Sequence, residues 1–372
     1  MGEQEGPSAA GHPRVALYSH DTMGIGHLRR NLLIAHTFAR PPLSASLLLI
    51  AGAREAAAFP TPPGADWLTL PSLYKTADGR YRARALGVSL EELIGLRAKV
   101  IAAALRSFAP DVLVVDKEPC GAVGELEPAL RILRAGRRTR CVLGLRDVLD
   151  DPATVRREWD GAANQDAIRR YYEAVWVYGD PAVYDPVREY HFGPEVAAKV
   201  SYTGYLDPRA CPAPVPAGNA DTLPDAAGLP DRFALCLVGG GQDGVRLAEA
   251  FAWAEPLSGT GAVIVTGPFM PAEARQRLHR SAVEHPRLRI LEFVTDLGRL
   301  LGQADQVVAM GGYNTVCEVL SFGKPALIVP RVSPRREQLI RAERLRALGL
   351  LDVLQPDEAT PQALSRWLAR AP

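Results

Sequence analysis

The sequence has little net charge, few cysteines and no long apolar segment. Its 43 basic and 42 acidic side chains leave a formal net charge of +1, so no overall field attracts nucleic acid or an anionic membrane. No apolar run approaches the roughly 20 residues that a membrane-spanning helix needs. Residues 1–13 are polar and lack the apolar core of a signal peptide. We therefore expect a cytoplasmic protein without nucleic-acid partners or an integral membrane segment.

The five cysteines form no CxxC motif and no close pair with histidine. Such a scattered set is typical of reduced thiols in a core, which again favours the cytoplasm. The acidic residues are also widely spread, so we do not expect a metal site held by protein side chains. No repeat of solenoid length is present, and nothing in the pattern indicates an oligomeric state.

Short apolar strands alternate with helical segments along most of the chain. Strands are predicted at residues 14–20, 44–51, 67–70, 111–116, 141–145 and 174–178, and then at 233–238, 262–266, 288–293, 306–310 and 326–329. Helical spacing is clearest at residues 27–39, 90–108 and 361–368. This alternation predicts an α/β protein with open parallel sheets and right-handed crossovers.

The alternation is interrupted once, between Asp207 and Pro230. This stretch is rich in Pro, Ala, Gly and Asp and has no periodicity, as is typical of an interdomain linker. A chain of 372 residues is also too long for one ordinary core. We therefore predict two Rossmann-like domains facing a central cleft, residues 1–207 and 231–372, with a linker at 208–230.

The first candidate site is the segment DTMGIGHLRR, residues 21–30, directly after the first predicted strand. Gly24 and Gly26 allow a sharp turn and leave room for a ligand. A helix then begins near His27, which places free N–H groups and an imidazole where open α/β sheets bind ligands. A tight turn with an exposed histidine is the alternative. The dinucleotide fingerprint is incomplete, because no third glycine or strand-end acid follows at the right place.

Polar side chains also follow two later strands of the first half. Asp116 and Glu118 come at the end of one buried strand, and Arg146 follows the next. Carboxyl ends of parallel strands share one edge of a sheet, so these groups are expected to line the cleft. Polar strand exits without a binding role are the alternative. The expected acceptor-side set is Gly24, Gly26, Arg29, Asp116, Glu118 and Arg146.

The second candidate site is VGGGQDG, residues 238–244, after the first strand of the second half. Three successive glycines can bring backbone amides close enough to cradle a phosphate. An ordinary glycine-rich turn is the alternative. The Lys-Ser/Thr of a nucleotide-triphosphatase loop is missing, which argues against ATP hydrolysis.

The third and strongest candidate begins at MGGYNTVCEVL, residues 310–320. Gly311 and Gly312 end a predicted strand. Asn314 and Thr315 then open a helix, whose N-terminal amides and hydroxyl can hold a diphosphate.

The same segment continues with polar groups that suit a nucleotide sugar. Glu318 lies about one turn into the helix, where its carboxylate can accept hydrogen bonds from ribose hydroxyls. After the next strand, Arg331, Glu337 and Gln338 return polar groups to the carboxyl end of the sheet. A purely structural helix does not need this combination.

These segments resemble the donor-binding signature of GT-B glycosyltransferases. The similarity is greatest to the family that contains the UDP-N-acetylglucosamine transferase of peptidoglycan synthesis and the plant galactolipid synthases. Related bacterial glycosyltransferases also carry a GxGHLRR-like loop. The resemblance covers most of the chain and implies a GT-B fold with the donor on the second half and the acceptor on the first.

The resemblance also implies roles for single residues. Gly241 and Gln242 are expected to approach the diphosphate. Phe293 and Val294 are expected to border the base. Glu318 is expected to hold the ribose, and the loop histidine His27 to act as the acceptor-side base or to contact the diphosphate. The full donor-binding set is Gly240, Gly241, Gln242, Phe293, Val294, Gly311, Gly312, Asn314, Thr315, Glu318, Arg331, Glu337 and Gln338.

Two departures from the family pattern bear on the substrates. Glu337-Gln338, expected to meet the donor sugar, replaces the usual His-Gln or Asp-Gln, and Gly-Gly-Tyr-Asn replaces Ala-Gly-Ala ahead of Thr315, so the sugar is left open. The segment that docks lipid-modifying relatives to the membrane carries arginines here, which favours a soluble, anionic acceptor. These are Arg80, Arg82, Arg84 and Arg97.

The function predicted from the sequence is sugar transfer from a nucleotide sugar, with UDP as the expected nucleotide, to a small soluble hydroxyl or amine acceptor. The nucleotide sugar is a co-substrate, and no metal or other cofactor is expected. Natural-product or cell-envelope glycosylation is the expected setting. Three alternatives remain open: a hydrolase of the same donor that uses water, a non-hydrolysing 2-epimerase, and a catalytically idle nucleotide-sugar-binding protein.

Overall fold

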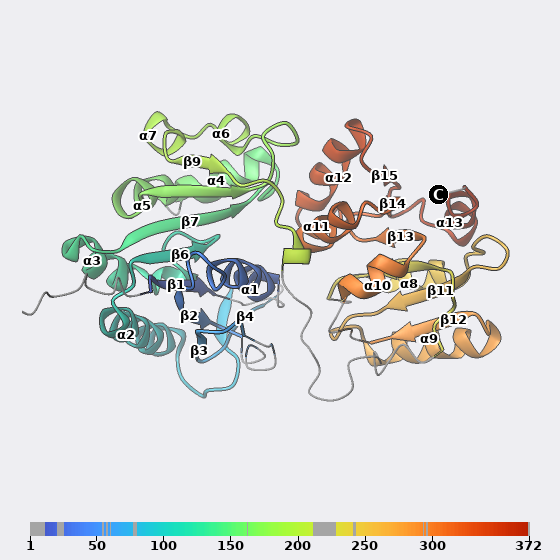
Figure 1. Ribbon diagram of the computed structural model, residues 1–372, viewed down its shortest axis with the longest axis horizontal. Helices are drawn as coiled ribbons and strands as arrows, with labels where there is room; N and C mark the ends of the chain where they lie inside the picture. The colour runs from blue at the N-terminus through green and yellow to red at the C-terminus, as the bar shows by residue number, and fades with distance from the viewer. Residues whose placement is uncertain are drawn as a thin grey trace, which may run out of the picture. The chain divides into compact units, whose positions relative to one another are not determined.

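Two parallel sheets carry the fold of this protein (Figure 1). The computed structural model describes residues 12–20, 26–53, 56, 59, 61–76, 80–161, 163–210, 228–240, 243–292, 294 and 297–370. Four residues of the predicted sites lie outside this described part: Gly24, Gly241, Gln242 and Phe293.

The first sheet has seven strands in the order β3-β2-β1-β6-β7-β8-β9. They are β1 (Arg14–Ser19), β2 (Ser46–Ala51), β3 (Ala65–Thr69), β6 (Val112–Asp116), β7 (Arg140–Arg146), β8 (Ala174–Tyr178) and β9 (Val200–Tyr202). The pairings from β3 to β7 are parallel. The central strand β1 is apolar and buried along most of its length, as expected for a parallel strand covered on both faces. A small antiparallel hairpin, β4 (Leu73–Lys75) and β5 (Tyr81–Ala83), accompanies this sheet.

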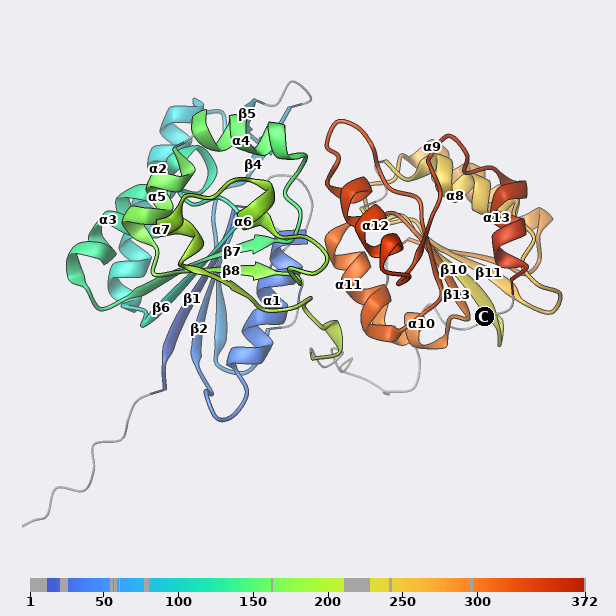
Figure 2. The same ribbon diagram turned by 90° about the horizontal axis from the view of Figure 1, so that it is seen from above.

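Helices cover the first sheet on both sides. The helices of this part of the chain are α1 (Gly26–Phe38), α2 (Leu90–Phe108), α3 (Glu127–Gly136), α4 (Pro152–Gly161), α5 (Asn164–Tyr171), α6 (Pro186–Glu189) and α7 (Pro194–Ala197), with short turns η2 (Ala122–Gly124) and η3 (Pro208–Ala210). In Figure 2, α1 lies on one side of the strands and α2, α3 and α5 lie on the other. Helix α2 begins at a capping box, in which Ser89 and Glu92 bond each other's backbone N–H.

The second sheet has six parallel strands in the order β12-β11-β10-β13-β14-β15. They are β10 (Phe233–Leu237), β11 (Gly261–Val265), β12 (Leu288–Leu291), β13 (Gln306–Ala309), β14 (Ala326–Ile328) and β15 (Asp352–Val353). The helices are α8 (Val245–Ala252), α9 (Ala272–Glu284), α10 (Leu297–Gln303), α11 (Tyr313–Phe322), α12 (Glu337–Ala347) and α13 (Pro361–Leu368).

The two faces of the second sheet have separate cores. Along β10, Ala234 and Cys236 pack with α8, α9 and α13, whereas Leu235 and Leu237 pack with α10, α11 and α12. This follows from the alternation of side chains along a strand. The continuous apolar sequence of the strand is therefore used on both faces.

The chain packs as two compact units whose boundaries differ from the two sheets. One unit contains residues 1–145, 163–176 and 198–201; the other contains 146–162, 177–197 and 202–372. The predicted partition into 1–207, 208–230 and 231–372 therefore follows the sheets rather than these units, and it stays a prediction. None of the described helices is both long and apolar enough to cross a membrane.

Candidate functional site

The direction of winding reverses beside the first strand of each sheet. β1 lies between β2 and β6, and β10 lies between β11 and β13. In open α/β sheets, ligands bind beyond the carboxyl ends of the strands at such a reversal. The segments that follow these ends are residues 20–25 and 117–121 in the first sheet, and 238–244 and 310–312 in the second. The glycine-rich motifs of the sequence therefore follow the strands at which a ligand is expected.

His27, Arg30 and Asp116 form a hydrogen-bonded cluster in the first unit. His27 and Arg30 belong to the start of α1, and Asp116 is the last residue of β6. The Asp116 carboxylate bonds His27 Nδ1 and both Nε and Nη2 of Arg30, the latter two at 2.9 and 2.6 Å. Asp116 is fully buried, the Arg30 side chain is 3% exposed and that of His27 is 18% exposed. His27 is therefore the most accessible member of the cluster.

The charge of Asp116 sets the tautomer of His27. Burial alone would raise the pKa of Asp116, but Arg30 and His27 lower it well below its usual range, so the carboxylate is ionised. An ionised carboxylate only accepts hydrogen bonds, so Nδ1 of His27 carries a proton, and in the neutral imidazole Nε2 is then the acceptor. Arg30 Nη2 also lies 2.9 Å from His27 Nδ1, but both atoms donate to the same Asp116 oxygen. The cluster therefore presents Nε2 as a base.

Two further titratable groups lie beside His27. The buried ring of His20, directly after β1, has its centroid 4.8 Å from that of His27. Burial, together with His27 and Lys117, lowers the pKa of His20 well below its usual value, so His20 is neutral. Burial would raise the pKa of Glu118, but the Lys117 ammonium at 2.9 Å lowers it to about 2. These neighbours therefore add a neutral imidazole and the Lys117–Glu118 ion pair to the surroundings of His27.

The remaining acceptor-side residues are placed as follows. Gly26 is the first residue of α1, and Arg29 lies half-buried in the first turns of that helix. Arg146 ends β7 and falls in the second compact unit, whereas Asp116 and Glu118 fall in the first. Five of the six predicted acceptor-side residues are thus described, and Asp116 directly bonds His27.

Sequence reasoning missed Arg30 and His20. Arg30 lies three residues after His27 on the same helix, and this spacing places both on one helical face. That signal was available in the sequence. His20 was assigned only to the end of a strand, and nothing local indicates that its ring meets His27.

In the second unit, the loop after β10 packs closely on the loop after β11. Phe269 N donates to Gly240 O at 2.9 Å. Gly267 has a φ of +74°, and a Cβ added there would lie 2.2 Å from Gly239 O. Only glycine therefore fits at position 267 without displacing the backbone of Gly239.

The third motif forms the expected helix at the end of β13, with one correction. Helix α11 begins at Tyr313, with Gly312 as its N-cap, so its first residue precedes Asn314. Gly can serve as an N-cap, and without a side chain Gly312 makes no side-chain cap hydrogen bond. Thr315 follows in the first turn. Glu318 is 4% exposed, which makes it a buried carboxylate on the second turn.

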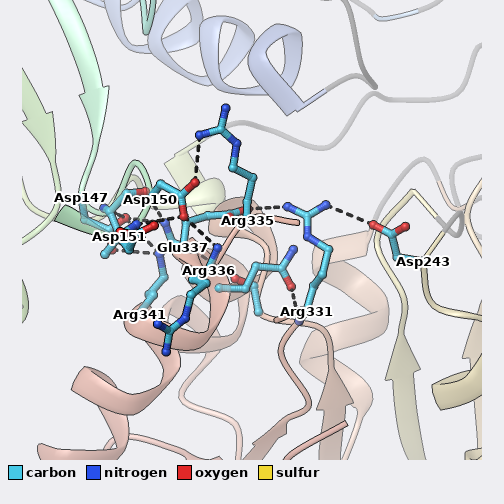
Figure 3. Close-up of polar contacts among 12 residues, drawn as sticks. Asp147, Asp150, Asp151, Asp243, Arg331, Arg335, Arg336, Glu337 and Arg341 are labelled. Atoms are coloured by element: carbon cyan, nitrogen blue, oxygen red, sulfur yellow. Dashed lines mark hydrogen bonds and ion pairs between the residues drawn. The ribbon is translucent and has the colours of Figure 1, made fainter. Parts of the chain in front are cut away.

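Arg331 links the glycine-rich loop to the start of α12. Its Nη1 donates to Asp243 Oδ2 at 3.0 Å, and its Nη2 donates to Glu337 Oε1 at 2.6 Å (Figure 3). Gln338 Oε1 accepts a bond from Arg331 N at 3.0 Å. A Cβ added to Gly311 would lie 3.3 Å from the Gln338 side chain. The structure therefore brings Gly311, Arg331, Glu337 and Gln338 together.

A group of arginines after β14 was also missed. Arg335 Nη1 donates to Asp150 Oδ2 at 2.8 Å and to Glu158 Oε2 at 3.0 Å. Arg336 N donates to Asp150 Oδ1 at 2.8 Å. These partners are far apart in the sequence, so no spacing rule indicates them.

Two other expectations concern Val294 and the metal. Val294 packs against the core on the α10–α12 side of the sheet. Among the described residues, no three side chains of His, Cys, Asp or Glu are grouped so that they could hold a metal ion. The expectation of a metal-independent site stays a prediction.

Comparison with known proteins adds a family match to this geometry. Residues 234–371 match the glycosyltransferase family 28 C-terminal domain. A related sequence is the UDP-N-acetylglucosamine–N-acetylmuramyl-(pentapeptide) pyrophosphoryl-undecaprenol N-acetylglucosamine transferase of Haemophilus influenzae (strain PittGG). It is 28% identical over 141 residues, which are 36% of this chain and 38% of that protein. The match thus spans less than half the length of this curated relative.

Solved structures share the fold over almost the whole chain. MurG of Acinetobacter baumannii has a TM-score of 0.55 at 15% identity, covering 95% of this chain and 89% of that one. A Listeria monocytogenes protein assigned as a UDP-N-acetylglucosamine 2-epimerase has a TM-score of 0.63 at 13% identity, covering 95% and 86%. The protein has the GT-B fold, as predicted, and its resemblance to the peptidoglycan N-acetylglucosamine transferase family is confirmed.

Proposed function

We propose that this protein is a glycosyltransferase that moves a sugar from a nucleotide sugar, with UDP as the nucleotide, to a small soluble acceptor with a hydroxyl or amine group. The observation that carries the proposal is the family 28 match over residues 234–371. This matched region includes Gly311–Gly312 and α11, at the reversal point of the second sheet. An α-helix N-terminus at such a point suits a diphosphate.

The proposed acceptor base is His27. Its Nε2 would remove the proton from the acceptor hydroxyl as the acceptor oxygen bonds to the anomeric carbon of the sugar. The bond from that carbon to the diphosphate oxygen breaks, and the nucleoside diphosphate leaves with the electron pair. Asp116 would hold the imidazole in the required tautomer and stabilise its protonated form, and general base catalysis of this kind contributes about 10²–10⁴-fold.

The donor site would hold the diphosphate through backbone N–H groups. These are the amides at the start of α11 and, by resemblance, those of the glycine-rich loop at 239–244. Glu318 would bond the ribose, and Glu337 with Gln338 would meet the sugar. Such fixed dipoles stabilise the charge that develops on the leaving diphosphate without a metal ion. We place the reaction in the cytoplasm, where the free cysteines Cys120, Cys141, Cys236 and Cys317 remain reduced.

The test is a panel of nucleotide sugars, with release of the nucleoside diphosphate as the readout, in the presence and absence of cell extract and of EDTA. A transferase releases UDP only when extract supplies an acceptor, and EDTA has no effect. Release in water alone would identify a hydrolase instead. A protein that binds the donor and releases nothing with any extract would be a nucleotide-sugar-binding protein, and the transferase proposal would be wrong.

A further inference from the structure

A fully buried ion pair joins α12 to the segment that follows β7. Arg341 and Asp147 are both 0% exposed. Arg341 Nε and Nη2 donate to the Asp147 carboxylate at 2.7 to 2.9 Å, and Figure 3 shows the two side chains facing each other. The same carboxylate accepts bonds from Val148 N at 2.7 Å and Tyr205 OH at 2.9 Å. Both oxygens are therefore bonded, as a buried carboxylate requires.

Arg341 also contacts the turn that starts α11. Its Nη1 donates to Gly311 O at 3.1 Å. Its guanidinium carbon lies 5.5 Å from the centroid of the Tyr313 ring, within the range of a cation–π contact. Gly311 and Tyr313 flank Gly312, the N-cap of α11. The arginine therefore holds both sides of the Gly-Gly turn.

The hydrogen bond to Gly311 fixes the direction of the next amide. Among the described residues the two cis peptide bonds precede Pro42 and Pro334, so the peptide between Gly311 and Gly312 is trans. In a trans peptide the C=O and N–H point in opposite directions. With Gly311 O directed at Arg341, the Gly312 N–H points away from the buried guanidinium. Because glycine tolerates many backbone conformations, this peptide needs an external contact to keep one orientation.

We propose that Arg341, held in place by Asp147, is a positioning residue for the nucleotide-sugar donor. It orients the Gly311–Gly312 peptide so that the Gly312 N–H is presented to the diphosphate at the start of α11. Arg341 is not expected to touch the donor. The inference rests on the proposed function, because it assigns a role within the donor site.

The test is Arg341→Lys. Lysine keeps the positive charge but lacks the planar fork that bonds Asp147 and Gly311 together. We expect the dissociation constant of UDP, measured by isothermal titration calorimetry, to rise about tenfold, and the KM for the donor to rise with it. The kcat should fall as well, by up to about 10²-fold, because a misdirected Gly312 N–H no longer stabilises the charge that develops on the leaving diphosphate.

The matched control is Arg97→Lys in the first unit. Arg97 and Glu125 also form an ion pair in which both side chains are 0% exposed. This variant should lower the melting temperature in a similar way and leave the UDP dissociation constant unchanged. An Arg341→Lys protein that melts lower but binds UDP like the wild type would limit the pair to a structural role and overturn the inference.

Two further results would also decide the role of Arg341. If Arg341→Lys does not fold, Tyr205→Phe replaces it: this change removes only the hydroxyl bonded to Asp147, and we expect the UDP dissociation constant to rise about threefold. Unchanged affinity would again overturn the inference. A wild-type protein that binds no nucleoside diphosphate would refute the proposed donor site itself, and the role of Arg341 with it.

Discussion

The substitution Asp116→Asn tests the link between Asp116 and His27 most directly. It replaces one carboxylate oxygen by an NH₂ group and hardly changes the volume. In the wild type the carboxylate accepts bonds from Arg30 and from His27 Nδ1. The new carbonyl oxygen can keep one of these bonds, but the new NH₂ group would face an N–H donor. One partner must then turn away or change its protonation.

The cost in stability follows from the burial of the pair. Removing one charge of a buried ion pair costs about 3–5 kcal/mol, because the other charge stays buried. The retained hydrogen bond to Arg30 and the 18% exposure of His27 place Asp116→Asn near the lower end, at about 3 kcal/mol. For a protein of 372 residues that melts as one unit, we expect the melting temperature to fall by about 4 °C.

The expected loss of turnover in Asp116→Asn follows from a change in the tautomer of His27. If the new NH₂ group donates to His27 Nδ1, the imidazole proton moves to Nε2, which can then no longer accept the acceptor proton. We expect turnover to fall about 10⁴-fold. The proposed nucleotide contacts belong to the second unit, so UDP affinity should change by less than about threefold.

The assay is UDP release at saturating donor, well below the melting temperature of the variant. Glu127→Gln is the control, because it removes a carboxylate that bonds Arg131 at the surface at 2.7 Å; such exposed pairs contribute about 0–1 kcal/mol. Wild-type turnover in folded Asp116→Asn protein would refute the reasoning, since it would show that the carboxylate does not orient the base.

Three further predictions concern single residues of the site. His27→Ala should lower turnover by about 10²–10⁴-fold and leave UDP affinity within a factor of a few; a parallel loss of affinity in calorimetry would indicate a diphosphate contact instead. Glu318→Gln keeps the shape of the buried side chain and should weaken UDP binding about tenfold, because a charged acceptor is lost; unaltered affinity would remove Glu318 from the donor site. The pKa of His20 is lowered on folding, so its contribution to stability is full above the ordinary pKa of about 6.5 and is lost as the pH falls below it. From pH 7 to pH 5, the unfolding free energy of the wild type in urea titrations should therefore fall by up to about 2 kcal/mol more than that of His20→Gln. Equal decreases in the two proteins would show that His20 does not titrate in this way.

The strands and the longer helices were predictable because their signals are local. The run of apolar residues at 174–178 is the strand β8, and the predicted helices at 90–108 and 361–368 are α2 and α13. Boundaries moved by one or two residues where glycine or a polar residue ends the run, as at α11, which begins at Tyr313. Periodicity and turn residues within ten or twenty positions were enough for these elements.

The candidate site was predictable only in part, since its contacts join distant positions. The sequence indicated His27 and Asp116 separately, because each follows the end of a strand. Their direct bond depends on β1 and β6 being neighbours in the sheet, which no local pattern states. The bond between Asp147 and Arg341 spans 194 positions. Its existence depends on the tertiary packing of the second unit, so neither residue stood out as half of a pair.

The same bond limits how this chain can be divided by cloning. Because residues 208–230 have the composition of a linker, they are the natural place to divide the chain into two fragments. The C-terminal fragment would then contain the whole second sheet. This fragment would carry Arg341 without the counter-ion supplied by Asp147 and without Tyr205, because residues 146–162 and 202–207 also belong to the second compact unit. A buried guanidinium without its carboxylate destabilises its surroundings strongly. A donor-binding half exchanged between related enzymes should therefore carry its own partner for Arg341, and the join in a chimaeric enzyme has to respect a unit that is discontinuous in the sequence.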